Sequence, residues 1–208
     1  MGLNGVSFLA MSQYPVAAGR ARGGVPRCLK AICPWEGLHD PYQDMFFEGG
    51  VQEQGFPLFW WHTEVKNTIN TSMEDFVRIE GQLPHEMAET HPFYDDYWQD
   101  QALDRQLAKV PRKVPVLTVH SLFDQEDIYG PLASHAAMIR RDRSARRTHL
   151  AIGPWCHGQS TGDGSSLGSL QWDADTSKQF RDGMLKPFWD HHLKGKRPAE
   201  PLPWLPLP

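Results

Sequence analysis

The chain has 208 residues, a formal net charge of -4, 40% hydrophobic residues and 11% aromatic residues. This is the composition of a globular protein, and its slightly acidic balance gives no electrostatic reason to bind nucleic acid or an anionic membrane. No apolar run is long enough to span a bilayer, no signal peptide is visible, and the three cysteines read as free thiols, which leaves the compartment undecided.

The first residues read as a short strand that leads into a tight turn. Ser7 stands two residues after Gly5 and three before Ala10. Small residues in these places suit the strained strand-to-helix turn that presents a nucleophilic serine, and residues 8–22 read as the helix that follows. By itself this spacing does not separate a catalytic serine from an ordinary loop serine.

Three short apolar runs farther along the chain, at 29–34, 114–120 and 148–152, predict buried parallel strands. Helical spacing follows at 130–140, and 176–193 reads as an amphipathic helix that an internal proline bends or interrupts. This alternation of strands and helices predicts an α/β fold with a mostly parallel sheet.

Between about residues 57 and 110 the strand pattern gives way to helical spacing, as in 73–80 and 97–107. We therefore predict a helical cap inserted into one sheet domain over 1–195. Residues 196–208 are rich in proline and are expected to form a tail without regular helix or central strand.

Residues of complementary chemistry follow three of the predicted strands: Ser7, Asp124 and His157. The carboxyl ends of parallel strands meet at one edge of a sheet, and the order Ser, Asp, His is that of α/β-hydrolases. Serine needs a base to remove its proton, histidine is such a base near neutral pH, and a buried carboxylate orients the ring. The alternatives are a turn-forming Asp124 and a loop histidine satisfied by backbone groups. The histidines show no metal-type spacing, so neither a metal nor a cofactor is expected.

Several segments together resemble the signatures of one hydrolase family. They are 114–124, Gly-Pro-Trp-Cys-His at 153–157, Phe-Trp-Asp-His-His-Leu-Lys-Gly at 188–195, the Trp-Glu-Gly segment at 35–50, and 91–98. These segments are similar to those of the CocE/NonD hydrolases, which include cocaine esterase, X-Pro dipeptidyl-peptidases and α-amino-acid ester hydrolases. The resemblance covers about residues 1–195. It implies an α/β-hydrolase catalytic domain that lacks the family's N-terminal strands and C-terminal jelly-roll domain, with Ser7 as nucleophile, Asp124 as orienting acid and His157 as base.

The resemblance also implies how the oxyanion is held. The backbone N–H of Phe8 is one expected donor, although Phe8 and Ala10 stand where the family usually has tyrosine and a second glycine. The family's second donor is a tyrosine hydroxyl from a loop before the elbow, which this sequence does not contain. Since losing one donor costs about 10²–10³ in rate, we expect weak or no hydrolysis of activated esters by these residues alone. A catalytically impaired, truncated remnant is the alternative.

Within the family, 98–104 and 124–130 look most like α-amino-acid ester hydrolases, which hold the substrate's α-ammonium with a cluster of carboxylates. Glu126 and Asp127 match two members of that cluster, and Asp44 or Asp40 is expected to be the third. The alternative is a solvated acidic loop face.

The expected protein is a serine hydrolase that cleaves esters or amides of small acyl groups, including α-amino-acid esters, through an acyl-enzyme. X-Pro dipeptidyl-peptidase-like activity is the alternative. The expected partner is a small-molecule ester or amide, with no nucleic acid and no membrane, and assembly into a homo-oligomer is left open.

Overall fold

The computed structural model describes residues 1–20, 23–60, 63, 72, 74–75, 78, 84–108, 114–142 and 147–196. The chain divides into two compact units, Met1–His39 with Leu103–Pro208, and Asp40–Ala102. Apart from Lys196, the predicted tail at 196–208 lies outside the described residues, as does most of the predicted helix at 73–80. Within the described ranges, no helix has the length and apolar character needed to cross a membrane.

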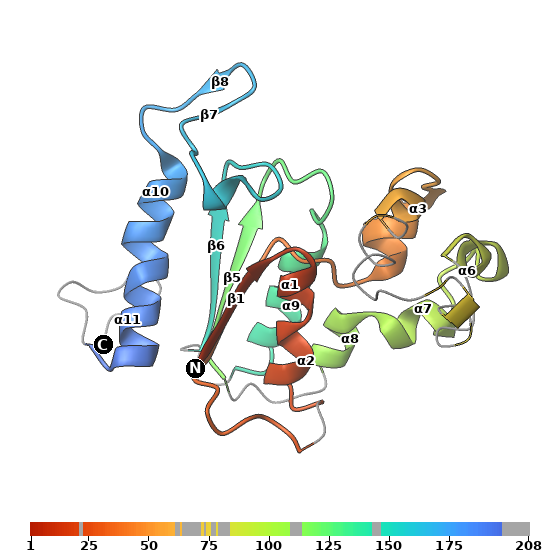
Figure 1. The fold of residues 1–208 in the computed structure, drawn as a ribbon, viewed down its shortest axis with the longest axis horizontal. Coiled ribbons are helices and arrows are strands. Elements are labelled where there is room, and N and C mark those ends of the chain that lie inside the picture. Colours follow the sequence, from red (N-terminus) through yellow and green to blue (C-terminus); the bar gives the residue numbers. More distant parts are fainter. Residues whose placement is uncertain are drawn as a thin grey trace. The chain divides into compact units, whose positions relative to one another are not determined.

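A parallel sheet forms the centre of the first unit, and its four strands follow the order β1-β2-β5-β6 (Figure 1). Their bounds are Gly2–Val6 for β1, Ala31–Trp35 for β2, Val116–Ser121 for β5 and Thr148–Gly153 for β6. Every neighbouring pair runs parallel. The predicted α/β fold is therefore confirmed, and the observed strands lie close to the predicted ranges.

The second strand differs from the prediction, which ended it at Pro34. β2 pairs with β5 at Ile32 opposite Val116 and again at Trp35 opposite Val119, so the pairing resumes beyond the proline. Pro34 has no N–H to give to the ladder, but the pairs on both sides of it keep the strand in place. This extension carries the carbonyl of Trp35 to the turn that follows β1.

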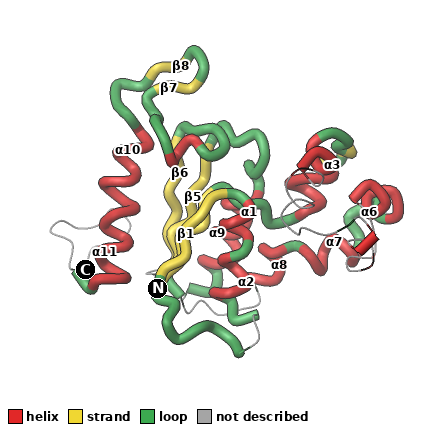
Figure 2. Tube along the Cα trace, viewed as in Figure 1, coloured by secondary structure: helices red, strands yellow, loops and turns green. Residues whose placement is uncertain are grey.

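Helices lie on both sides of the strands (Figure 2). On one side, α2 (Gln13–Ala17), α8 (Leu103–Leu107) and α9 (Gly130–Ile139) contribute side chains to one buried cluster, and α1 (Phe8–Met11) precedes α2 in the chain. On the opposite face, α10 (Thr176–Phe180), a π-helical segment (Arg181–Leu185) and α11 (Lys186–Lys194) follow one another without a break. Layers of helix on both faces are the expected covering of a parallel sheet.

Two helices differ in detail from their predicted ranges. The predicted helix at 8–22 is divided at Ser12 into α1 and α2, because the ring of Pro15 would collide with the carbonyl four residues earlier in one continuous helix. In the last helix, Pro187 lies in the first turn of α11, and the π-helical turn before it accommodates the missing N–H. The predicted interruption at that proline is therefore a local change of helical geometry.

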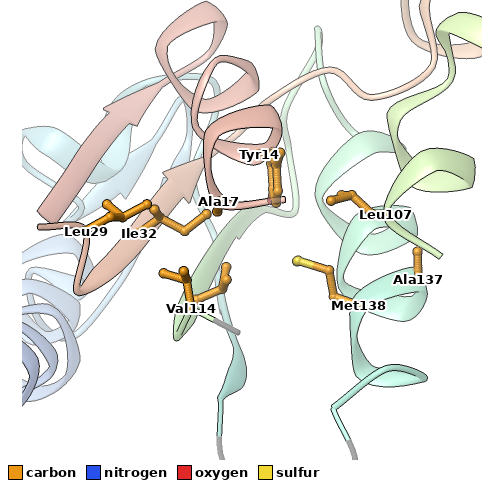
Figure 3. Packing of buried hydrophobic residues seen from close by; sticks show 9 residues of the cluster. Tyr14, Ala17, Leu29, Ile32, Leu107, Val114, Ala137 and Met138 are labelled. Carbon is orange, nitrogen blue, oxygen red and sulfur yellow. The ribbon is translucent and has the colours of Figure 1, made fainter. Parts of the chain in front are cut away.

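The core of the first unit has two halves because strand side chains alternate between the faces. Ile32 and Val116 pack with Tyr14 of α2 and Met138 of α9. Figure 3 labels Ile32, Tyr14 and Met138 in this cluster. Their neighbours Ala31, Cys33, Leu117 and Val119 point the other way and pack with Phe180 and Phe188 of the last helix.

The second unit packs around aromatic side chains. Trp98, which is 1% exposed, is surrounded by Phe46, Phe47, Tyr42 and Tyr94, and its indole N–H donates to the carbonyl of His91 at 2.8 Å. The elements are a π-helix at Tyr42–Phe46, the hairpin strands β3 (Phe47–Glu48) and β4 (Val51–Gln52), and the helices α3 (Phe56–Trp60), α6 (Pro84–Thr90) and α7 (Asp96–Gln101).

The predicted helix at 97–107 is interrupted at Ala102, which has extended backbone between α7 and α8. The division of the chain into units falls at the same residue. The predicted cap limits of 57 and 110 stay a prediction, since most of 61–83 and all of 109–113 lie outside the described residues.

The buried leucine of β5 gives a test of this packing. Leu117 is 0% exposed and belongs to the cluster under the last helix, whereas Leu132 in α9 is 41% exposed. Leu117→Ala should lower the free energy of unfolding in urea by about 2–5 kcal/mol, because it removes buried contacts and leaves a cavity. The matched control Leu132→Ala should change it by less than about 1 kcal/mol. Equal effects of the two substitutions would contradict the assignment of Leu117 to the core.

Candidate active site

Ser7 lies on a strained turn between β1 and α1. Its backbone has φ 60° and ψ -127°, a region that non-glycine residues rarely adopt. The turn is fixed by its N–H, which donates to the carbonyls of Trp35 and Glu36, each at 2.9 Å. This strand-turn-helix geometry is the one that the sequence pattern predicts for presenting a nucleophile.

Close backbone packing explains the small residues around Ser7. A Cβ on Gly5 would lie 2.5 Å from the Cβ of Leu9, and one on Gly37 would lie 2.7 Å from the Cβ of Ala10. Both distances are too short for real side chains. Ala10 therefore replaces the second glycine of the family pattern because Gly37, on the segment opposite, leaves room for its methyl group.

Asp124 and His157 are in direct contact at the same edge of the sheet. The Nδ1 atom of the His157 ring lies 3.0 Å and 3.1 Å from the two carboxylate oxygens of Asp124. Asp124 also accepts the backbone N–H groups of Glu126 at 2.9 Å and Asp127 at 3.0 Å. From the sequence, Asp124 could either form a turn or orient a histidine. Its hydrogen bonds to the loop backbone and to His157 are compatible with both roles.

The loops after β5 and β6 hold each other in place. The N–H of Leu122 donates to the carbonyl of Gly153 at 2.9 Å, and that of Phe123 donates to the carbonyl of Trp155 at 3.0 Å. The ladder between the two strands thus continues past their ends until it reaches Asp124 on one side and His157 on the other.

The electrostatics around His157 favour a charged ring. Burial opposes the charge, but the hydrogen bond and charge of Asp124, with the charges of Glu126 and Asp127, outweigh it and raise the pKa of His157 to about 9. Burial of Asp124 raises the pKa of its carboxyl group. The hydrogen bond with His157 and the two backbone N–H groups outweigh this effect and lower the pKa. At neutral pH the substrate-free site therefore holds an imidazolium among carboxylates.

The described residues include no hydrogen bond from the Ser7 hydroxyl, to His157 or to any other group. The Nε2 atom of His157, which would have to take the serine proton, lies 3.6 Å from a carboxylate oxygen of Glu126. The structure therefore brings two of the three predicted residues together and leaves the serine contact unmade. Catalytic hydrogen bonds often tighten only when substrate is bound, so the triad stays a prediction.

The remaining predicted site residues divide between the two units. Phe8 is the first residue of α1, so its N–H belongs to the first helical turn, where the prediction requires an oxyanion donor. Glu126 and Asp127 lie beside His157, with Asp127 3.9 Å from Nδ1. Asp40 and Asp44 are buried in the second unit.

Asp40 and Asp44 both accept hydrogen bonds from nearby groups of the second unit. Asp40 accepts the hydroxyl of Tyr94 at 2.6 Å, the side-chain amide of Gln43 at 2.9 Å and the N–H of Tyr42 at 3.0 Å. Asp44 accepts the N–H of Asp40 at 3.0 Å. The choice between them as a third amine ligand stays a prediction.

Glu36, which immediately follows β2, is a further polar residue at this edge of the sheet, and it was not among the predicted site residues. Its carboxylate is fully buried, and its ligand atoms lie within 4.8 Å of those of Asp124 and His157. Three carboxylate and imidazole groups at such distances can hold a metal ion, but here protein N–H and O–H donors already occupy both Glu36 oxygens. The same rule that found the triad, polar residues just past strand ends, would have found Glu36 as well.

The family model for X-Pro dipeptidyl-peptidase (S15 family) matches residues 1–159. The chain belongs to this family. No curated protein sequence matches the chain.

Solved structures agree with the family. An aminopeptidase from a marine sediment archaeon, Thaumarchaeota archaeon, is 29% identical, with a TM-score of 0.79 over 98% of this chain and 36% of that one. An α-amino acid ester hydrolase is 32% identical, with a TM-score of 0.78 over 97% and 36%. A CocE/NonD family hydrolase from Staphylococcus aureus is 25% identical, with a TM-score of 0.59 over 95% and 30%.

These matches confirm the CocE/NonD resemblance and the α/β-hydrolase fold. The relatives are hydrolases, and the chain spans about a third of the length of the structures that it matches.

A titration of His157 tests the site electrostatics. In the unmodified protein its ring should titrate well above the ordinary value of 6.5, near 9, when followed by NMR. Glu126→Gln should lower this pKa, because it removes a negative charge that favours the protonated ring. The exposed Asp173 gives a control, since Asp173→Asn should leave the titration unchanged. A His157 pKa at or below 6.5 in the unmodified protein would contradict this description.

Proposed function

We propose that the protein is a serine hydrolase that cleaves esters or amides of small acyl groups through an acyl-enzyme, and that α-amino-acid esters are its substrates. The observation that carries the proposal is the strained Ser7 turn at the sheet edge where Asp124 already holds His157. A backbone strained at a reactive side chain persists only when the surrounding structure fixes it, and such strain gathers at active sites.

In the proposed reaction the Ser7 oxygen attacks the substrate carbonyl carbon while Nε2 of His157 takes the hydroxyl proton. Nδ1 faces Asp124, so Nε2 is the nitrogen left for this transfer. His157 then gives the proton to the leaving alcohol or amine as the bond to the acyl carbon breaks. Water, activated by the same nitrogen, releases the acid and restores Ser7. The N–H of Phe8 is the proposed donor to the oxyanion.

The carboxylates beside His157 support an amine-bearing substrate. Glu126 and Asp127 add negative charge next to a ring that must be neutral to act as a base. A substrate α-ammonium bound between them would offset both charges and lower the pKa of His157. An amine-bearing substrate would thus favour the neutral form of His157, which can take the Ser7 proton, whereas an ester without the amine would meet a protonated ring.

The family description supports a second substrate class, X-Pro dipeptides, which also carry a free amine. The two classes differ in the leaving group and in the length of the acyl part. Gly-Pro-p-nitroanilide hydrolysis faster than that of phenylglycine methyl ester would favour the dipeptidyl-peptidase.

The amine contact gives the sharpest test of the substrate class. Glu126→Gln and Asp127→Asn should each lower kcat/KM for phenylglycine methyl ester by about one to two decades, because a charge-assisted hydrogen bond to the ammonium is worth roughly 1.5–3 kcal/mol. Phenylacetic methyl ester is the matched control without the amine. Its kcat/KM should not fall, and at neutral pH it should rise, because removing either charge lowers the pKa of His157 and frees the neutral base.

Ser7→Ala sets the background of the assay and should abolish turnover of both esters. Equal losses on the two esters in the Glu126 and Asp127 variants would mean that these acids only support the loop. Turnover that survives Ser7→Ala would contradict the serine mechanism itself.

A further inference from the structure

Glu36 is a buried carboxylate surrounded by donors from two other segments. It is 0% exposed, and one of its oxygens accepts the hydroxyls of Ser121 at 2.5 Å and Ser160 at 2.9 Å. The other oxygen accepts the backbone N–H of Gly158 at 2.5 Å. Ser121 ends β5, while Gly158 and Ser160 belong to the loop after β6. The Glu36 side chain thus links the end of β2 to the end of β5 and to the loop after β6.

The backbone of Glu36 is as unusual as its side chain. Its φ is 48°, and Ser7 and Glu36 are the non-glycine residues with positive φ in the described part of the chain. The two strained residues are in contact, since the N–H of Ser7 donates to the carbonyl of Glu36 at 2.9 Å. The N–H of Glu36 donates in turn to the carbonyl of Val119 in β5.

Three contacts of Glu36 involve a residue of the proposed triad or a residue close to one. Its carbonyl holds Ser7 directly. The backbone carbonyl of Ser121 accepts the N–H of Asp124 at 3.2 Å, and Gly158 follows His157 in the chain. A buried carboxylate is costly unless its hydrogen bonds are satisfied, and positive φ at glutamate costs further free energy. Both costs fall where the segments that carry Ser7, Asp124 and His157 meet.

We propose that Glu36 is a positioning residue, which holds the His157 loop against the ends of β2 and β5 so that the His157 ring meets Asp124. The role of Glu36 in catalysis rests on the proposed function, whereas its hydrogen bonds position the His157 loop in the absence of substrate. The contact between His157 and Asp124 depends on a loop whose first anchor after the histidine is the Gly158 N–H.

The test uses two substitutions that differ in what they can accept. Glu36→Met keeps the volume and removes both acceptors, which leaves Gly158 without its partner. Glu36→Gln keeps one oxygen for Gly158 and turns its amide group toward the serine hydroxyls, which can rotate to accept. Ser160→Ala is the matched control, because it removes one hydrogen bond of the same carboxylate and spares the Gly158 contact.

The readouts are the NMR titration of the His157 ring and hydrogen exchange at the Gly158 amide in the full 208-residue chain. Asp124 raises the pKa of His157 through its contact, against burial, with Glu126 and Asp127 adding smaller contributions. Glu36→Met should therefore lower that pKa by about one pH unit or more and speed exchange at Gly158. Ser160→Ala should leave both close to the unmodified protein. Glu36→Gln loses the same charge as Glu36→Met but keeps the Gly158 contact, so it should lower the pKa less and leave Gly158 exchange unchanged.

An unchanged His157 titration with unchanged Gly158 exchange in Glu36→Met would overturn the proposal. If that variant does not fold, the unmodified protein decides, because Gly158 exchange as fast as that of an unstructured peptide would equally overturn it. Where esters are turned over, Glu36→Met should reduce kcat more than it changes KM. The NMR readouts need no turnover, so the positioning result stands or falls independently of the proposed hydrolysis, and a failure of the proposed function would leave it standing.

Discussion

The contact between Asp124 and His157 depends on the parallel register of β5 and β6. The two strands pair without interruption as far as Ser121 opposite Gly153, and two backbone hydrogen bonds then continue the pairing into their loops. A one-residue slip would turn the side chains of one strand to the opposite face and separate the two loops. The alternating core residues on both faces of β5 oppose such a slip, so the packing of the sheet fixes the geometry of the site.

The site concentrates negative charge around one imidazole. Three acids of the loop after β5 approach the His157 ring, and Glu36 lies on the neighbouring segment. Asp124 and Glu36 are fully engaged by donors of the protein, which gives them structural reasons to be there. Glu126 is partly exposed and lies 3.6 Å from Nε2 of His157, the nitrogen that the proposed reaction uses. This difference separates acids that build the site from the acid best placed to meet a cationic substrate.

Much of the fold could be predicted from the sequence because its strands are short apolar runs with clear ends. The same ends point to Asp124 and His157, since parallel strands bring their carboxyl ends to one edge. Details that depend on single backbone conformations could not be predicted. β2 continues through Pro34 because flanking pairs hold it, and the first helix divides because Pro15 cannot sit in a continuous one.

Glu36 is the clearest residue that prediction missed. Its place directly after β2 could have marked it as a candidate, but the sequence does not show its positive φ or its partners more than 80 residues away. The short separation of Glu126 and Asp127 from Asp124 made their proximity predictable. The place of Asp40 and Asp44 was not predictable in the same way, because they belong to a segment whose helices follow aromatic packing rather than strand ends.

The proposed role of Ser7 as the nucleophile of this site can be tested directly by covalent labelling. A fluorophosphonate reacts with an activated serine when the oxygen displaces fluoride from phosphorus, and the adduct can be located by peptide mass spectrometry. If Ser7 is the nucleophile, the adduct should form on Ser7 and should form more slowly in His157→Ala, since the base is then missing. An adduct on a different residue, or labelling of Ser7 at an unchanged rate without His157, would contradict it.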